Sequence, residues 1–99
     1  MYKIGFEPEA EKEFLALPDK DRSLVAKKII TLQKGQFQKD KPLKGKHKGK
    51  FRKRAGSFRI IYLKEGNLLL ITIIRIAHRK KVPRQTTGVI EQPYELIID

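Results

Sequence analysis

The groups of this chain that could do chemistry are cationic side chains. Six of them fall at strand positions that would share one face of a sheet: Lys50, Arg52, Arg54, Arg59, Arg75 and Arg79. Strand side chains alternate between two faces, so adjacent strands would gather these cations on one surface. Such a surface needs an anion to neutralise it. A polyanion is therefore the expected partner.

A phosphodiester is the bond that such a surface could cleave. RNA supplies its own nucleophile, the ribose 2′-OH. The protein then has to help remove that proton, neutralise the phosphorane-like transition state and assist the departing 5′ oxygen. DNA lacks this hydroxyl, which makes RNA the favoured substrate on chemical grounds. His78 is a candidate acid or base, because histidine exchanges protons near neutral pH; a partly exposed histidine with no catalytic role is an equal alternative.

The sequence lacks the residues that other catalytic chemistries need. Beyond residue 39 its only acids are Asp40, Glu65, Glu91, Glu95 and Asp99, and no two are spaced as a carboxylate pair for catalytic magnesium. There is no cysteine, and two histidines alone cannot build a zinc centre. Neither a GxxxxGK[ST] phosphate loop nor a G-x-S-x-G elbow occurs. We therefore expect neither a metal ion nor another cofactor.

The net charge of the chain favours a polyanionic partner such as nucleic acid. Its 99 residues hold 23 Lys and Arg against 11 Asp and Glu, a net charge of +12 that exceeds what solubility requires of a small domain. The stretch from Lys44 to Arg54 carries seven cations and no acid. Candidate RNA-binding residues are the basic residues near the strand positions: Lys44, Lys46, Lys48, Lys53, Arg54, Arg75, Lys80 and Lys81. For the lysines before residue 50, ordinary solvation is an equal alternative.

Apolar periodicity predicts a strand and two helices in the first third of the chain. Residues 2–6 alternate as in a half-buried strand. Pro8 suits the start of a helix that Pro18 ends, and Asp19 or Asp21 can cap a second helix. The buried face of that second helix should hold three apolar residues: Val25, Ile29 and Leu32.

From residue 51 onward the pattern changes to strands. Residues 36–50 hold little apolar material and are expected to form a long loop. Residues 58–63 alternate, residues 64–67 provide a turn, and residues 68–77 are apolar on both faces like a central strand. The expected fold class is α+β: an N-terminal strand, a helical hairpin, and then a twisted antiparallel sheet of three to four further strands, with the helices on one side.

No segment has the features of a leader or a membrane anchor. The longest apolar run lies within residues 68–74 and is far shorter than the roughly 20 residues of a membrane helix. The N-terminal residues show no long apolar run after their first basic residue, as a secretory signal would. We expect a soluble, cytoplasmic protein with no membrane contact.

Three segments occur in a specific order: PEAEKEFLALP, PLKGKHKGKFRKRAGSFRIIY and LLLITIIRIAHRKKV. This order resembles the RelE/ParE superfamily of toxins from type II toxin–antitoxin systems. The resemblance is closest to the RelE-like branch, whose members are metal-independent endoribonucleases that cut messenger RNA in the ribosomal A site. It implies a RelE-like toxin domain over residues 1–83, followed by a C-terminal extension over residues 84–99 whose structure the sequence does not define. The implied partners are messenger RNA, the ribosome and a cognate antitoxin, with operator DNA reached only through the antitoxin.

The strand motif G-x-x-R-I-x-Y carries the family's catalytic positions onto this chain. The resemblance implies that Arg59 is the arginine that stabilises the transition state and that Arg79 is a second essential arginine. Lys50 and Arg52 fall on the family's basic pair, one of which assists proton removal. Arg52 stands where a lysine is common, so Lys50 is the better candidate for that role.

One departure from the family pattern bears on catalysis. Many relatives carry a tyrosine near the position of Pro83, whereas the next tyrosine of this chain is Tyr94. Either His78 or Tyr94 takes over its role, or cleavage is weak or absent. Two alternatives therefore stand beside RNA cleavage: a ParE-like inhibitor of DNA gyrase, and a catalytically weak nucleic-acid-binding member of the same fold.

Overall fold

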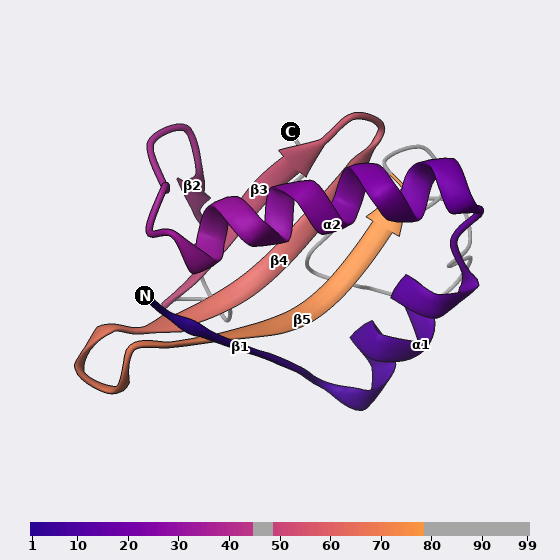
Figure 1. Cartoon of the computed structure of the whole chain (residues 1–99). Coiled ribbons are helices and arrows are strands. Elements are labelled where there is room, and N and C mark those ends of the chain that lie inside the picture. The colour runs from indigo at the N-terminus through magenta and orange to yellow at the C-terminus, as the bar shows by residue number, and fades with distance from the viewer. Residues whose placement is uncertain (45–48, 79–99) are drawn as a thin grey trace.

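The computed structural model describes residues 1–44 and 49–78, which form a five-stranded sheet with two helices on one face (Figure 1). The strands are β1 (Lys3–Phe6), β2 (Lys41–Pro42), β3 (Lys50–Ala55), β4 (Phe58–Glu65) and β5 (Leu70–His78). Their order in the sheet is β1-β5-β4-β3-β2. β1 runs parallel to β5 and the other neighbours are antiparallel, so the sheet is mixed. The predicted α+β class, with a strand and a helical hairpin before the main sheet, is confirmed.

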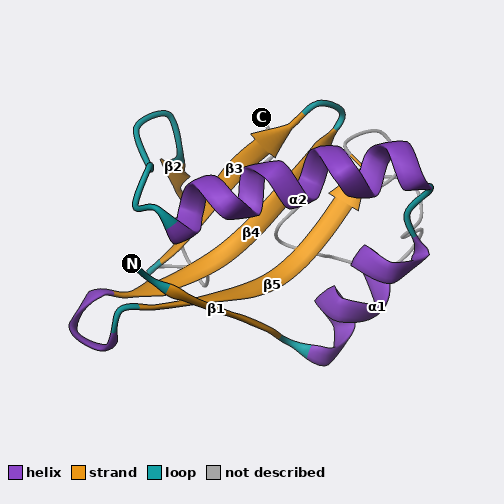
Figure 2. Cartoon of the chain, viewed as in Figure 1, coloured by secondary structure: helices purple, strands orange, loops and turns teal. Residues whose placement is uncertain are grey.

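The helices α1 (Pro8–Ala16) and α2 (Asp19–Gln33) form the predicted hairpin (Figure 2). Pro8 occupies the first turn of α1, where its missing N–H would have no helical partner. The prediction that Asp19 or Asp21 caps α2 is wrong, because Pro18 occupies the N-cap position and no side chain caps the helix. Both aspartates lie in the first turn instead, where their charge interacts favourably with the helix dipole.

A Schellman motif ends α2 and directs the chain back toward the sheet. Gly35 adopts a φ of 80°, a left-handed conformation that glycine accepts without strain. Its N–H donates to the carbonyl of Leu32 at 3.0 Å, and the N–H of Gln36 donates to the carbonyl of Thr31 at 2.9 Å. The segment after Gly35 is thereby placed beside strand β3.

The hydrophobic core lies between the helices and the middle strands of the sheet. The predicted face of α2 is buried there: Val25, Ile29 and Leu32. β4 contributes Phe58, Ile60 and Tyr62, which alternate with residues that face the other way. β5 contributes three isoleucines: Ile71, Ile73 and Ile76. One face of the sheet is therefore committed to packing.

The predicted loop over residues 36–50 contains a short edge strand. In β2, Lys41 pairs with Arg52 and Pro42 with Phe51 of β3. Proline is tolerated at a sheet edge because it has no N–H to contribute to a further strand. Leu43 then donates its N–H to the carbonyl of Lys50 at 2.9 Å, and its side chain is buried. The segment is therefore attached to the sheet up to residue 43.

The connection between β4 and β5 is a short 3-10 helix, η2 (Gly66–Leu68), close to the turn predicted at residues 64–67. Leu69 follows with a φ of 51°, so β5 begins at Leu70 and not at Leu68. Farther along this hairpin, Ile61 pairs with Arg75 but Tyr62 pairs with Ile73, which leaves an irregularity in β5. Such a bulge increases the local twist of the sheet.

The β3–β4 turn offers a test of the packing between sheet and helix. Gly56 has a φ of 64°, and a Cβ atom there would lie 2.7 Å from Cδ2 of Leu24 on α2. We predict that Gly56→Ala lowers the free energy of unfolding by about 1–2 kcal/mol, because alanine is strained in the left-handed region and Leu24 must move. Urea denaturation measures the effect. Gly66→Ala is the matched control, since a Cβ atom at Gly66 would have no neighbour within 4 Å. An equal loss of stability in both variants would contradict the predicted strain at Gly56 and its contact with Leu24.

Candidate functional site

The face of the sheet turned away from the helices gathers basic residues from three strands. Pairing sets Arg54 directly opposite Arg59, and Arg52 opposite Ile61, which in turn pairs with Arg75. Lys50 continues the series on β3, opposite Leu63. We call these five basic residues, Lys50, Arg52, Arg54, Arg59 and Arg75, the cationic face. The pairing of β3, β4 and β5 thus brings together five of the six cations selected from the sequence.

Two of these arginines are deeply buried. Counted over the whole residue, backbone included, Arg52 is 6% exposed and Arg59 is 5% exposed, and by this measure no other charged residue in the described parts of the chain is so buried. Arginine stays charged when buried and holds its donors in a rigid planar fork that matches a phosphate. The centre of the cationic face therefore consists of permanent, preorganised cations.

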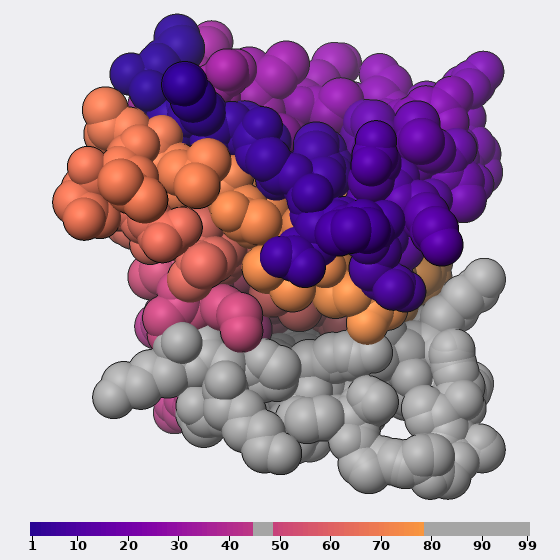
Figure 3. All heavy atoms as spheres, turned by 90° about the horizontal axis from the view of Figure 1, so that it is seen from below, coloured from indigo at the N-terminus to yellow at the C-terminus, as the bar shows by residue number. Residues whose placement is uncertain are grey.

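Arg75 is held at the edge of the cationic face by a carboxylate from α1. Its Nε lies 2.7 Å from one oxygen of Glu13, whose other oxygen accepts the backbone N–H of Ile76 at 2.7 Å. β1 pairs with β5 only as far as Ile73, and α1 lies against the part of β5 beyond it (Figure 3). Glu13 thus satisfies an edge group of β5 and partly neutralises Arg75.

Two other predicted residues lie on the helix-covered face. His78 pairs with Phe58 and makes an edge-to-face ring contact with it, with centroids 5.1 Å apart. Lys53 pairs with Ile60, and its Nζ lies 2.9 Å from Asp40 and 3.2 Å from the carbonyl of Gln36. The register therefore separates His78 and Lys53 from Arg59.

Of the remaining predicted site residues, one is among the described residues and the others lie outside them. Lys44 is exposed just after β2. Five predicted positions lie outside the described residues: Lys46, Lys48, Arg79, Lys80 and Lys81. The predicted domain boundary at residue 83 and the extension over residues 84–99 lie outside them as well.

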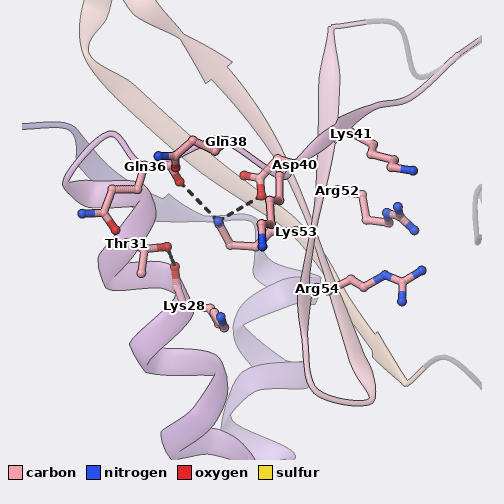
Figure 4. A pocket seen from close by; sticks show the side chains of 10 residues that line it. Lys28, Thr31, Gln36, Gln38, Asp40, Lys41, Arg52, Lys53 and Arg54 are labelled. Carbon is pink, nitrogen blue, oxygen red and sulfur yellow. Dashed lines mark hydrogen bonds and ion pairs between the residues drawn. The ribbon is translucent and has the colours of Figure 1, made fainter.

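A buried polar network beside the cationic face was not predicted from the sequence. The side chain of Asp40 is 3% exposed, accepts the hydroxyl of Tyr62 at 2.5 Å and pairs with Lys53 (Figure 4). Burial, and then the neighbouring carboxylate, raises the pKa of Tyr62 far above its ordinary value. One signal was available in the sequence: Asp40 is the only acid among residues 22–64, a region rich in lysine and arginine.

Aromatic rings fasten the same segment to the sheet. The Tyr62 ring stacks on both Phe37 and Phe51, with centroid separations of 6.2 and 5.7 Å. The ammonium group of Lys64 lies 4.4 Å from the centroid of Phe37 and 5.3 Å from that of Phe51. Tyr62 therefore anchors residues 37–40 through both its ring and its hydroxyl.

Within residues 1–44 and 49–78, no three His, Cys, Asp or Glu side chains cluster closely enough to hold a metal ion. In the same ranges neither helix has the length and apolar character needed to cross a bilayer.

A family model matches most of the chain. Residues 4–83 match the family model described as the ParE toxin of type II toxin–antitoxin system, parDE. The chain belongs to this family. It is thus a type II toxin of the RelE/ParE group, as the order of its motifs predicted. Among curated proteins, none matches this toxin.

Solved structures share the fold of the toxin. The toxin–antitoxin complex RelBE2 from Mycobacterium tuberculosis matches at 24% identity with a TM-score of 0.71, over 78% of this chain and 96% of that one. The intact E. coli RelBE complex matches at 20% identity and 0.67, over 79% and 96%. The isolated E. coli RelE toxin matches at 16% identity and 0.68, over 99% and 96%. At these identities the likeness establishes the fold.

The buried network generates a stability prediction. Asp40→Asn leaves Lys53 in a dehydrated site without its carboxylate, so we predict a loss of about 3–5 kcal/mol in the free energy of unfolding. Asp19→Asn is the matched control, because Asp19 pairs with Arg22 at the surface with its side chain 95% exposed; it should cost less than about 1 kcal/mol. Denaturant unfolding with the linear extrapolation separates the two, and similar losses would refute the proposed importance of the buried pair.

Tyr62 generates a prediction about alkaline pH. Its pKa is raised in the folded state, so its contribution to stability is complete below the pKa of an unfolded tyrosine, about 10, and is lost as the pH rises beyond that value. We predict that wild type loses stability faster than Tyr62→Phe between about pH 9 and pH 11. Tyr2→Phe serves as control for the loss of a phenol elsewhere. If the stability of wild type and of Tyr62→Phe fell in parallel with rising pH, the proposed link between Tyr62 ionisation and unfolding would be disproved.

Proposed function

We propose that this toxin is a metal-independent endoribonuclease that cleaves messenger RNA on the ribosome through attack by the ribose 2′-OH. The observation that carries the proposal is the placement of Arg59: a buried arginine at the centre of the cationic face, directly opposite Arg54 and beside Arg52. Two guanidinium groups directly opposite each other can donate hydrogen bonds to the oxygens of one phosphodiester.

The cationic face would act on the reacting phosphate. As the 2′ oxygen bonds to phosphorus, the bond to the 5′ oxygen breaks, and negative charge develops on the non-bridging oxygens. The guanidinium of Arg59 donates to those oxygens, and Arg52 and Arg54 bind the same phosphate or its neighbour. These donors are in place before the reaction, so no reorganisation is needed when charge develops.

Lys50 is proposed to assist removal of the 2′-OH proton. It lies on the cationic face, but it pairs with Leu63, which is four residues from Arg59 along β4, a separation of about 13 Å. The two long side chains must therefore converge on the substrate from both ends. From the family resemblance, Arg79 supplies a further cation, and Tyr94 is the candidate for the role that the tyrosine near the position of Pro83 has in relatives. His78, the other candidate for that role, lies on the helix-covered face of the sheet. The departing 5′ oxygen takes up a proton as its bond to phosphorus breaks.

The proposed protein partner is a cognate antitoxin. RelBE2 and E. coli RelBE are both toxin–antitoxin complexes with the same toxin fold. A partner with acidic and apolar segments would cover a chain of net charge +12 and attract it at long range. Operator DNA would be reached only through this antitoxin, and the toxin would act in the cytoplasm, where translating ribosomes are.

A second candidate is inhibition of DNA gyrase without RNA chemistry. The matching family model, which describes the ParE toxin of parDE systems, favours it. The cationic face favours the ribonuclease, because permanent cations around Arg59 suit a phosphodiester transition state. A catalytically weak member of the fold would bind RNA without cleaving it.

The deciding experiment follows messenger RNA in a translating extract supplied with wild type, Arg59→Ala or Arg59→Lys. We predict cleavage by wild type and a loss of about 100-fold or more in both variants, because a lysine at this position keeps the charge but not the planar fork. Arg22→Ala, which alters an arginine of α2 remote from the cationic face, is the control and should cleave like wild type. Intact RNA with wild type would end the ribonuclease proposal, and gyrase-dependent DNA breaks would establish the alternative.

A further inference from the structure

A pocket of about 740 Å³ lies where α2, the segment after it, β2 and β3 meet (Figure 4). Six cationic side chains line it: Lys28, Lys39, Lys41, Arg52, Lys53 and Arg54. In Figure 4, Lys41, Arg52 and Arg54 project to one side of the β2–β3 pair, and Lys28 and Lys53 lie on the other. The pocket therefore continues around the edge of the sheet, from the cationic face toward α2.

The described residues of the lining hold more cations than carboxylates. Asp40 is the only carboxylate among them, and that group is already engaged with Lys53 and with the hydroxyl of Tyr62. Lys41 and Arg52 stand directly opposite each other on β2 and β3, so a phosphate at this point would interact with both cations.

The lining also indicates the chemical class of the ligand. Every described residue that lines the pocket is polar or charged, whereas a protein partner would be expected to insert apolar or aromatic anchors. Arg52 and Arg54 belong both to the pocket and to the cationic face. A ligand that spans both regions must carry several negative charges along its length, as the backbone of an RNA strand does.

We propose that this pocket binds backbone phosphates of the RNA strand that flanks the reacting nucleotide, with Lys28, Lys39 and Lys41 as the binding residues. The inference rests on the proposed function and extends it to a second part of the molecule. A volume of about 740 Å³ is within the range of ligand pockets, roughly 300–1,000 Å³. Lysine binds phosphate as a point charge, so these contacts would hold the strand without reading its sequence.

The test measures RNA affinity against salt concentration, with no dependence on cleavage. The probe is a fluorescent 12-nucleotide RNA with 2′-O-methyl groups, which lacks the attacking hydroxyl. The variant Lys28→Gln/Lys39→Gln/Lys41→Gln loses three phosphate contacts. The slope of log affinity against log salt should therefore fall by about 2, and affinity at 0.1 M salt by on the order of 100-fold.

A second triple variant controls for net charge. The variant Lys3→Gln/Lys12→Gln/Lys20→Gln also removes three positive charges, but from exposed positions on β1, α1 and the start of α2, away from the pocket. Its slope should stay close to that of wild type. Equal losses in the two triple variants would show a general charge effect and overturn the proposal.

The remaining outcomes separate this proposal from the proposed function. A wild-type slope in the pocket variant, alongside cleavage that depends on Arg59, would overturn the pocket and leave the ribonuclease standing. A reduced slope without any cleavage by wild type would support the pocket and remove the ribonuclease. Normal RNA binding by the pocket variant with weakened antitoxin binding would assign the surface to the antitoxin and overturn the proposal.

Discussion

Alternation along β4 is the constraint on which both faces of the molecule depend. Phe58, Ile60 and Tyr62 point into the core, and Arg59 between them points to the opposite face. A slip of one residue would exchange these sets and place a guanidinium among apolar side chains. β4 is the middle strand of five, so β3 and β5 fix its register from both sides. The core and the cationic face are therefore two results of one pattern, and a change that disturbs one disturbs the other.

Tyr62 connects this pattern to the segment after α2. Its ring packs against both Phe37 and Phe51, while its hydroxyl donates to Asp40. Dehydration of both ions limits how much the pair of Asp40 and Lys53 adds to net stability. Its clearer effect is on position, because few placements of the segment satisfy the carboxylate, the ammonium group and the phenol together. The location of β2, and with it the wall of the basic pocket, follows from these contacts.

Local patterns predicted the helices and the alternation of β4, because each depends on the period of one element. The gathering of Arg52, Arg54 and Arg59 was predicted on the condition that the faces of two strands coincide, and the register of β3 and β4 meets this condition. The alternation of strand side chains also predicts that Lys53 and His78 lie on the other face. Lys53 is one residue from Arg52 and His78 is three residues from Arg75, and an odd spacing along a strand changes the face. The prediction of Lys53 and His78 as site residues rests on their chemistry and not on this spacing. The burial of Asp40 and the partner of β1 could not be predicted in this way. Both depend on segments far apart in the chain, and no local period specifies which segments meet.

The parallel pairing of β1 with β5 has a consequence for how the chain folds. Lys3 pairs with Leu70 and Phe6 with Ile73, so the first strand of the chain closes against the last strand described. Loops of this length are entropically costly to close, and folds dominated by such distant pairings form slowly. During synthesis β1 leaves the ribosome long before its partner exists. The cationic face, which needs β3, β4 and β5 together, is then assembled only after β5 has been made, so a chain that stops before β5 would lack it.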